Sequence, residues 1–175
     1  PLPPLIAKNR APGLGRSFSA QRWSWLPARA WMEAAEEAMD KEYQGTYDIW
    51  GGDIDPQAVA LARSNAEKAG VEDLVRFQVA DARRFARSEP YGRIVTNPPY
   101  GERMLEKKEA EGLYRDFGAA FRALPAGWSL ALLSSHTEFE RTFGAPAQKK
   151  RKLYNGMLKC DLFLYGKRGV PHEKT

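Results

Sequence analysis

The chain has 175 residues, 43% of them hydrophobic, which is enough for one core and leaves little for a second domain. Its 27 basic and 22 acidic side chains give a formal net charge of +5, which favours an anionic partner without the density of a nucleic-acid-binding tail. The sequence has no run of transmembrane length, no signal-peptide pattern and a single cysteine, so it offers neither a disulfide nor a metal cluster. We therefore expect a cytoplasmic, single-domain protein over residues 1–175, with no membrane span and no metal.

The first segment contains two features that could be taken for binding sites. Residues 13–16, Gly-Leu-Gly-Arg, follow no strand and open no helix, so we interpret them as a surface turn and not as a phosphate-binding loop. Residues 27–44 are predicted to form an amphipathic helix. The tryptophans near its start, Trp23, Trp25 and Trp31, could stack on bases, but we expect them to anchor the helix in the core.

The next segment has the pattern of a nucleotide-binding α/β unit. Residues 47–56 read as a strand that ends in an acidic loop, and residues 57–69 read as a helix that Gly70 stops. An acidic side chain after the second strand of such a fold holds a ribose diol, and we assign this role to Asp53, with Ile54 against an adenine ring. The alternative for Asp53 is a solvated turn carboxylate. Asp55 is expected to cap the helix and Pro56 to occupy its first position.

A second acidic residue follows the next predicted strand. Residues 74–80 alternate as a strand, and Asp81-Ala82 stands at its end. The Asp81 carboxylate could accept a hydrogen bond from an adenine amino group, and the Ala82 N–H could donate to the ring. The alternative is that Asp81 caps a helix over residues 82–87, and both roles can hold together.

The stretch 96–103, Thr-Asn-Pro-Pro-Tyr-Gly-Glu-Arg, comes directly after the apolar residues Ile94 and Val95. An exocyclic amino group on an aromatic ring is a poor nucleophile until hydrogen-bond acceptors draw on its protons. The Asn97 side chain and the Pro98 carbonyl supply two such acceptors, and Pro98-Pro99 holds the carbonyl rigidly because both φ angles are fixed. Tyr100 offers a face for base stacking. The alternative is a loop that closes the strand and is anchored by a packed Tyr100.

The remaining chain alternates helices and strands and ends in a hairpin. Residues 102–111 are expected to form an exposed loop or short helix, where Arg103, Lys107 and Lys108 either meet RNA phosphates or face solvent. The other predicted elements are a helix at 113–124, a strand at 128–134, a helix at 137–143 with Thr137 and Glu140 in a capping box, and hairpin strands at 148–154 and 157–165 around Asn155-Gly156. His136 is interpreted as a loop residue, Cys160 as a strand residue, and the basic run 149–152 as a phosphate contact or a charged strand edge.

Four segments carry a resemblance to a known family: residues 6–16, 52–56, 97–103 and 152–156. They resemble the S-adenosylmethionine-dependent amino-methyltransferases, and within these the bacterial family that methylates guanine N2 of large-subunit ribosomal RNA and carries an N-terminal THUMP RNA-binding domain. The resemblance implies an α/β, Rossmann-like class I methyltransferase fold with a mostly parallel sheet, three αβα layers and a C-terminal antiparallel hairpin. It implies S-adenosylmethionine as cofactor, ribosomal RNA as partner and an upstream THUMP-type domain in the full-length protein. The methyl-transfer site would be formed by Asn97, Pro98, Pro99 and Tyr100, and the cofactor would contact Asp53, Ile54, Asp81, Ala82 and Asn97.

The start of the chain departs from the family pattern. Members have a first strand and a glycine-rich loop before the segment that matches Ile6, and here the chain opens with Pro-Leu-Pro-Pro-Leu. We therefore expect a catalytic-domain fragment with a gap in its sheet and an incomplete cofactor pocket. Two alternatives stay open: the same chemistry on adenine N6 of DNA or RNA or on glutamine N5, and a non-catalytic fragment or RNA-binding remnant.

Overall fold

The computed structural model of the protein describes residues 2–101 and 104–166. The chain divides into two compact units, Pro1–Ala80 and Asp81–Thr175. Pro1, residues 102–103 and residues 167–175 lie outside the described part of the chain, and with them the proposed phosphate contact of Arg103.

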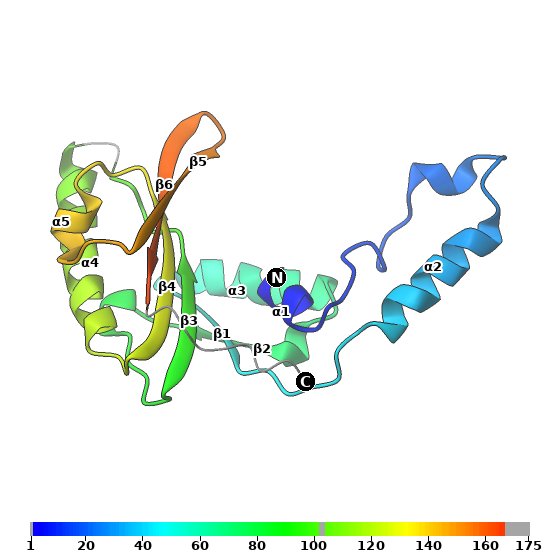
Figure 1. Cartoon of the computed structure of the whole chain (residues 1–175), viewed down its shortest axis with the longest axis horizontal. Helices are drawn as coiled ribbons and strands as arrows, with labels where there is room; N and C mark the ends of the chain where they lie inside the picture. The colour runs from blue at the N-terminus through cyan, green and yellow to red at the C-terminus, as the bar shows by residue number, and fades with distance from the viewer. Residues whose placement is uncertain (1, 102–103, 167–175) are drawn as a thin grey trace. The chain divides into compact units, whose positions relative to one another are not determined.

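The first unit contains a two-stranded parallel sheet with a helix packed on it. Its elements in chain order are α1 (Leu2–Ala7), η1 (Ser19–Arg22), α2 (Ala28–Asp40), β1 (Ile49–Asp53), α3 (Pro56–Lys68), η2 (Glu72–Leu74) and β2 (Val75–Val79) (Figure 1). The register of β1 on β2 runs from Ile49 opposite Val75 to Asp53 opposite Val79. Val59 and Ala66 on α3 and Val71 after it are buried in this unit.

Local sequence signals explain both ends of α3. The Asp55 carboxylate accepts a hydrogen bond from the Gln57 N–H at 2.8 Å, and Pro56 occupies the first helical position, as predicted. After the helix, Gly70 has a φ of +60°, the left-handed conformation that glycine adopts without steric cost. Residues 13–16 form the expected turn.

Helix α2 ends at Asp40, four residues before the predicted end at 44. The reason is a contact distant in sequence: the Tyr43 N–H donates to the Lys8 carbonyl at 2.8 Å, and the Asn9 side chain donates to the Lys41 carbonyl at 2.9 Å. The Glu42 carboxylate also pairs with Lys8 at 3.1 Å. These contacts use backbone groups that a longer helix would need for itself.

The expectation that the tryptophans form a core is wrong for two of the three. Trp23 is 51% exposed and Trp25 is 72% exposed, and they stack on each other with ring centroids 5.3 Å apart. Trp31 on α2 is half-buried and stacks on Phe18. Stacking on bases therefore stays an open alternative for Trp23 and Trp25.

The second unit contains a four-stranded mixed sheet with strand order β3-β4-β6-β5. Its elements are η3 (Ala82–Arg84), β3 (Tyr91–Thr96), α4 (Met104–Arg122), β4 (Gly127–Ser134), α5 (Phe139–Phe143), β5 (Lys149–Asn155) and β6 (Leu158–Tyr165). Strands β3 and β4 are parallel, and β6 is antiparallel to both β4 and β5, which is the predicted C-terminal hairpin. Helices α4 and α5 cover the same face of this sheet (Figure 1).

The core of the second unit lies between these helices and the sheet. It consists of Ala110, Tyr114, Phe117, Leu130, Leu132, Phe139, Phe143, Phe163 and Tyr165. Helix α4 extends further toward its N-terminus than the predicted 113–124, because Ala110 continues the buried stripe one turn before Tyr114. Gly118 allows the close approach of α5, since a Cβ there would lie 2.2 Å from the Phe143 carbonyl oxygen.

Two local predictions in this unit are wrong. Helix α5 begins at Phe139 with Glu138 as its N-cap residue, so Thr137 does not cap it. Glu140 does not complete a capping box; it accepts a hydrogen bond from the Ala147 N–H at 2.7 Å and pairs with Lys150 at 2.6 Å. In the hairpin the two turn residues are Gly156 and Met157, one position later than predicted, and Gly156 has the positive φ of +62° that a type II′ turn requires at its first central position.

Strands β1 and β3 carry exposed apolar side chains. Among the described residues β1 pairs only with β2, and β3 pairs only with β4. Val95 on β3 is 77% exposed and Trp50 on β1 is 40% exposed. No described helix is long and apolar enough to cross a membrane.

Candidate active site

The first group of predicted site residues, Asp53 and Ile54, lies at the carboxyl end of β1 in the first unit. Asp53 is exposed, and its Oδ1 accepts the Asp55 N–H at 2.9 Å, so the turn fixes the direction of the carboxylate. No described side chain donates to its second oxygen. Ile54 is 62% exposed. An oriented, accessible carboxylate beside an exposed apolar side chain fits the ribose and adenine of a nucleoside, while the binding itself stays a prediction.

Asp81 and Ala82 lie at the start of the second unit. Asp81 caps η3 by accepting the Arg83 N–H at 3.0 Å, as the alternative interpretation predicted, although this helix ends at Arg84 and not at 87. The Arg83 guanidinium also pairs with the carboxylate at 2.6 Å. The hydrogen bonds from the Arg83 side chain, and then from its backbone, lower the pKa of Asp81 below its usual value. The carboxylate therefore stays ionised and able to accept a further hydrogen bond.

The Asn97–Tyr100 loop follows the last residue of β3, at the carboxyl end of the strand. The Tyr100 hydroxyl donates to Asn97 Oδ1 at 2.6 Å and lies 3.4 Å from Asn155 Nδ2, on the last residue of β5. Because Tyr100 donates to it, the carbonyl oxygen of the Asn97 amide has a fixed direction and keeps one lone pair for another donor. Burial raises the pKa of the Tyr100 hydroxyl, so this group remains protonated and able to donate.

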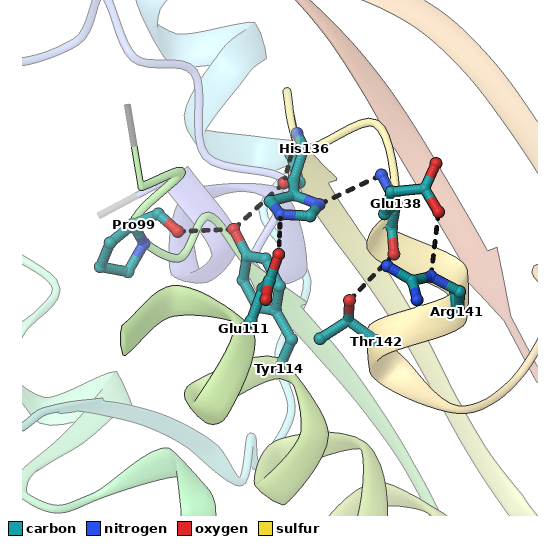
Figure 2. Close-up of polar contacts among 8 residues, drawn as sticks. Pro99, Glu111, Tyr114, His136, Glu138, Arg141 and Thr142 are labelled. Carbon is teal, nitrogen blue, oxygen red and sulfur yellow. Dashed lines mark hydrogen bonds and ion pairs between the residues drawn. The ribbon is translucent and has the colours of Figure 1, made fainter. Parts of the chain in front are cut away.

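A hydrogen-bonded network lies behind this loop (Figure 2). The Tyr114 hydroxyl on α4 contacts the Pro99 carbonyl at 2.5 Å and Ser134 Oγ, at the end of β4, at 3.2 Å. His136 donates its backbone N–H to Ser134 Oγ at 3.1 Å, and its Nε2 lies 3.1 Å from Glu111 Oε1. Tyr114 is 0% exposed and His136 is 7% exposed.

Sequence reasoning missed this network. His136 does lie in a loop, as expected, but it is buried and bonded on both ring nitrogens. The available signal was the pair Glu111 and Tyr114, three residues apart and hence on one face of a helix. That signal does not say which strand end lies opposite the helix, so the partners Ser134 and His136 could not be inferred.

The structure thus brings together part of the predicted site. Asn97, Pro98, Pro99 and Tyr100 form one loop with an internal hydrogen bond, and Asp53 with Ile54 forms a separate group in the other unit. Their assignments to methyl transfer and to the cofactor stay predictions. Across residues 2–101 and 104–166, no three His, Cys, Asp or Glu side chains gather in a way that could hold a metal ion. The side chains of Lys107 and Lys108 are exposed on α4.

Comparison with known proteins assigns the chain to a family. Residues 4–163 match the model of the RMKL-like methyltransferase domain. The chain belongs to this family. It is 40% identical over 171 residues to the Bacillus subtilis protein named "Putative RNA methyltransferase YpsC", covering 97% of this chain and 44% of that protein. It is 39% identical over 166 residues to the Ribosomal RNA large subunit methyltransferase K/L of Shewanella baltica, covering 92% of this chain and 23% of the relative.

A solved structure supports the fold. The crystal structure of SMU.472 complexed with SAH superposes with a TM-score of 0.88 at 40% identity, covering 94% of this chain and 44% of that one. The predicted class I methyltransferase fold is therefore confirmed, and the predicted enzyme class, a methyltransferase that uses S-adenosylmethionine, is confirmed at the level of the family. The chain spans less than half the length of each of these three proteins.

Proposed function

We propose that the full-length protein containing this chain transfers a methyl group from S-adenosylmethionine to guanine N2 of large-subunit ribosomal RNA. The observation that carries the proposal is the Asn97–Tyr100 loop at the carboxyl end of β3, where the 2.6 Å hydrogen bond from Tyr100 directs the Asn97 oxygen. The family membership supports the chemistry, and the name of the Shewanella baltica relative supports the class of RNA.

When bound, S-adenosylmethionine supplies an electrophilic methyl group. We propose that Asn97 Oδ1 and the Pro98 carbonyl accept hydrogen bonds from the two N–H groups of the target amino group, which localises the nitrogen lone pair and directs it toward this carbon. As the N–C bond forms, the bond from the methyl group to sulfur breaks, SAH leaves, and the proton that the nitrogen loses passes to solvent. The ring of Tyr100 stacks on the base, and its hydroxyl keeps the Asn97 oxygen in place. Catalysis then rests on positioning and hydrogen bonding, with no strongly shifted acid or base.

We propose that Asp53, Ile54, Asp81 and Ala82 hold the cofactor. One Asp53 oxygen is oriented by the Asp55 N–H, and the carboxylate is free to accept from the ribose hydroxyls. Ile54 contacts the adenine ring, and Asp81 and the Ala82 N–H bind its polar edge. Asn97 contacts both the cofactor and the target base.

We further propose that the full-length protein acts in the cytoplasm and that an upstream THUMP-type domain provides most of its RNA affinity. The net charge of +5 on this chain is modest, and it supports a secondary role in holding the RNA backbone.

The acceptor can be tested by measuring methyl incorporation from labelled S-adenosylmethionine into unmodified ribosomal RNA, duplex DNA and protein. The full-length protein is expected to label only the RNA. Label only in DNA would instead support adenine N6 methylation, and label only in protein would support glutamine N5 methylation. No transfer to any acceptor, together with no SAH binding in a calorimeter, would support a non-catalytic RNA-binding remnant.

A further inference from the structure

The Pro99 carbonyl is held by a tyrosine from the interior of the second unit. Tyr114 is 0% exposed, and its hydroxyl oxygen lies 2.5 Å from the Pro99 oxygen (Figure 2). A carbonyl oxygen can only accept a hydrogen bond, so the single hydroxyl proton of Tyr114 must point at Pro99. Burial raises the pKa of Tyr114, so the hydroxyl stays protonated and acts as a donor.

The other hydrogen bonds of this network then have fixed directions. Since the Tyr114 proton is used on Pro99, the 3.2 Å contact with Ser134 must be a donation from Ser134 Oγ to the Tyr114 oxygen. Ser134 Oγ in turn accepts the His136 N–H at 3.1 Å. The chain of donors therefore runs from His136 through Ser134 and Tyr114 to the Pro99 carbonyl.

The histidine end of the network is fixed as well. Nδ1 of His136 accepts the Glu138 N–H at 3.2 Å, which leaves the ring proton on Nε2, where it is donated to Glu111 at 3.1 Å. With 3% of its side chain exposed, His136 has no access to a substrate. Its contacts connect α4 to the loop that follows β4 and hold the Ser134–Tyr114 pair in place.

We propose that Tyr114 is a positioning residue for methyl transfer, which fixes the Pro99 carbonyl and so sets the direction of the adjacent Pro98 carbonyl. This inference rests on the proposed function, in which the Pro98 carbonyl accepts a hydrogen bond from the target amino group. The proline rings fix φ at both positions, so within the Pro98-Pro99 pair only the two ψ angles are free to rotate. Anchoring the Pro99 oxygen removes one of these freedoms.

The test removes the hydroxyl of Tyr114 and leaves its ring in the core. We expect Tyr114→Phe in the full-length protein to lower the single-turnover rate of methyl transfer about tenfold, because a small displacement of a positioning group is costly. The dissociation constants for SAH and for ribosomal RNA should change by less than about twofold, since the loss falls on the transition state. Amide exchange, followed by mass spectrometry, should speed up in the peptide that contains Asn97, Tyr100 and Gly101.

Tyr165 provides a matched control in the same core. It is 7% exposed and donates its hydroxyl to the Ala145 carbonyl at 3.1 Å, without contact to the loop. Tyr165→Phe should leave both the transfer rate and the loop exchange unchanged. An unchanged rate in Tyr114→Phe, or an equal loss in the two variants, would overturn the proposal, as would a rate loss that matches a loss of SAH affinity.

The same experiment separates this proposal from the proposed function. The acceptor that the wild-type protein methylates decides the function, and the ratio of variant to wild-type rate on that acceptor decides the role of Tyr114. If the wild type methylates nothing, the proposed function fails, and faster loop exchange in Tyr114→Phe than in Tyr165→Phe still supports the anchoring. Equal exchange in the two variants would overturn it.

Discussion

Asn97 and Tyr100 are the two side chains of the proposed methyl-transfer loop that are joined by a hydrogen bond. The hydroxyl of Tyr100 lies 2.6 Å from the Asn97 side-chain oxygen, so the tyrosine has a role beyond offering its ring to a base. The direction of the Asn97 oxygen decides which N–H of a target amino group can donate a hydrogen bond to it, because amide oxygens accept near the plane of the carbonyl. The role that we propose for Tyr100 therefore combines base stacking with orientation of the Asn97 oxygen.

Replacement of Tyr100 by phenylalanine separates these two roles. Tyr100→Phe retains the ring but removes the donor, so we expect the transfer rate to fall about tenfold while the affinity for RNA stays nearly constant. Tyr100→Ala should weaken RNA binding as well, by roughly the 1–3 kcal/mol of one stacked base. Single-turnover kinetics and RNA titrations would measure both effects. Equal transfer rates for the wild type and Tyr100→Phe would show that the hydroxyl plays no part in orientation.

Sequence reasoning at the residue scale succeeds where a signal is local. The cap formed by Asp55 was predicted, and the cap formed by Asp81 was the alternative left open for that residue; in both, the carboxylate bonds an N–H two residues ahead, which is a local signal. The network around Tyr114 was missed, because its partners Pro99 and Ser134 are 15 and 20 residues away in the chain. Contacts of that kind depend on how the helix packs against the strand ends, which no local pattern encodes.

At the scale of elements, α4 has two glycines in opposite environments. A Cβ on Gly118 would lie 2.2 Å from the Phe143 carbonyl oxygen of α5, whereas a Cβ on Gly112 would meet no atom within 4 Å. We expect Gly118→Ala to lower the free energy of unfolding by at least about 1–3 kcal/mol through overpacking. Gly112→Ala should raise it by about 0.5–1 kcal/mol, because alanine favours the helix. Urea unfolding of both variants tests this pair, and a stabilised Gly118→Ala would contradict the close packing of α4 and α5.

Glu140 joins α5 to the segment that leads into β5. Its hydrogen bonds with Lys150 and with the Ala147 N–H lower the pKa of the carboxyl group. A lowered pKa in the folded state adds stability that is fully present above the unfolded value, about 4.3, and is lost as the pH falls through the folded value. We expect Glu140→Ala to cost about 1 kcal/mol near pH 7 and less in acid, measured by urea unfolding at both pH values.

Thr137 is the control for this measurement. It precedes the same helix but does not cap it, so Thr137→Ala should change the free energy of unfolding by less than about 0.5 kcal/mol. A larger loss for Thr137→Ala than for Glu140→Ala would restore the predicted capping box. The sequence favoured that box because Thr and Glu stand three residues apart, and the structure instead uses Glu140 for a contact with the following loop.

At the scale of the whole molecule, the class of fold was readable from the sequence. The resemblance to the methyltransferase family implied this fold, and the alternating strand and helix patterns with a C-terminal hairpin agreed with it, although the turn of the hairpin lies one residue later than predicted. The ends of α2 and α4 were not readable, since Lys8 stops the first and the burial of Ala110 extends the second. The cofactor-binding roles of Asp53 and Asp81 stay predictions. The two residues belong to different units.

The most direct test is to identify the modified nucleoside. The full-length protein would be incubated with S-adenosylmethionine and unmodified large-subunit ribosomal RNA, and the digested RNA would be analysed by mass spectrometry. We predict N2-methylguanosine with the wild type and about a hundredfold less with Asn97→Ala, in line with the loss of one electrostatic contact to the reacting group. N6-methyladenosine as the product, or equal N2-methylguanosine with Asn97→Ala, would contradict the account.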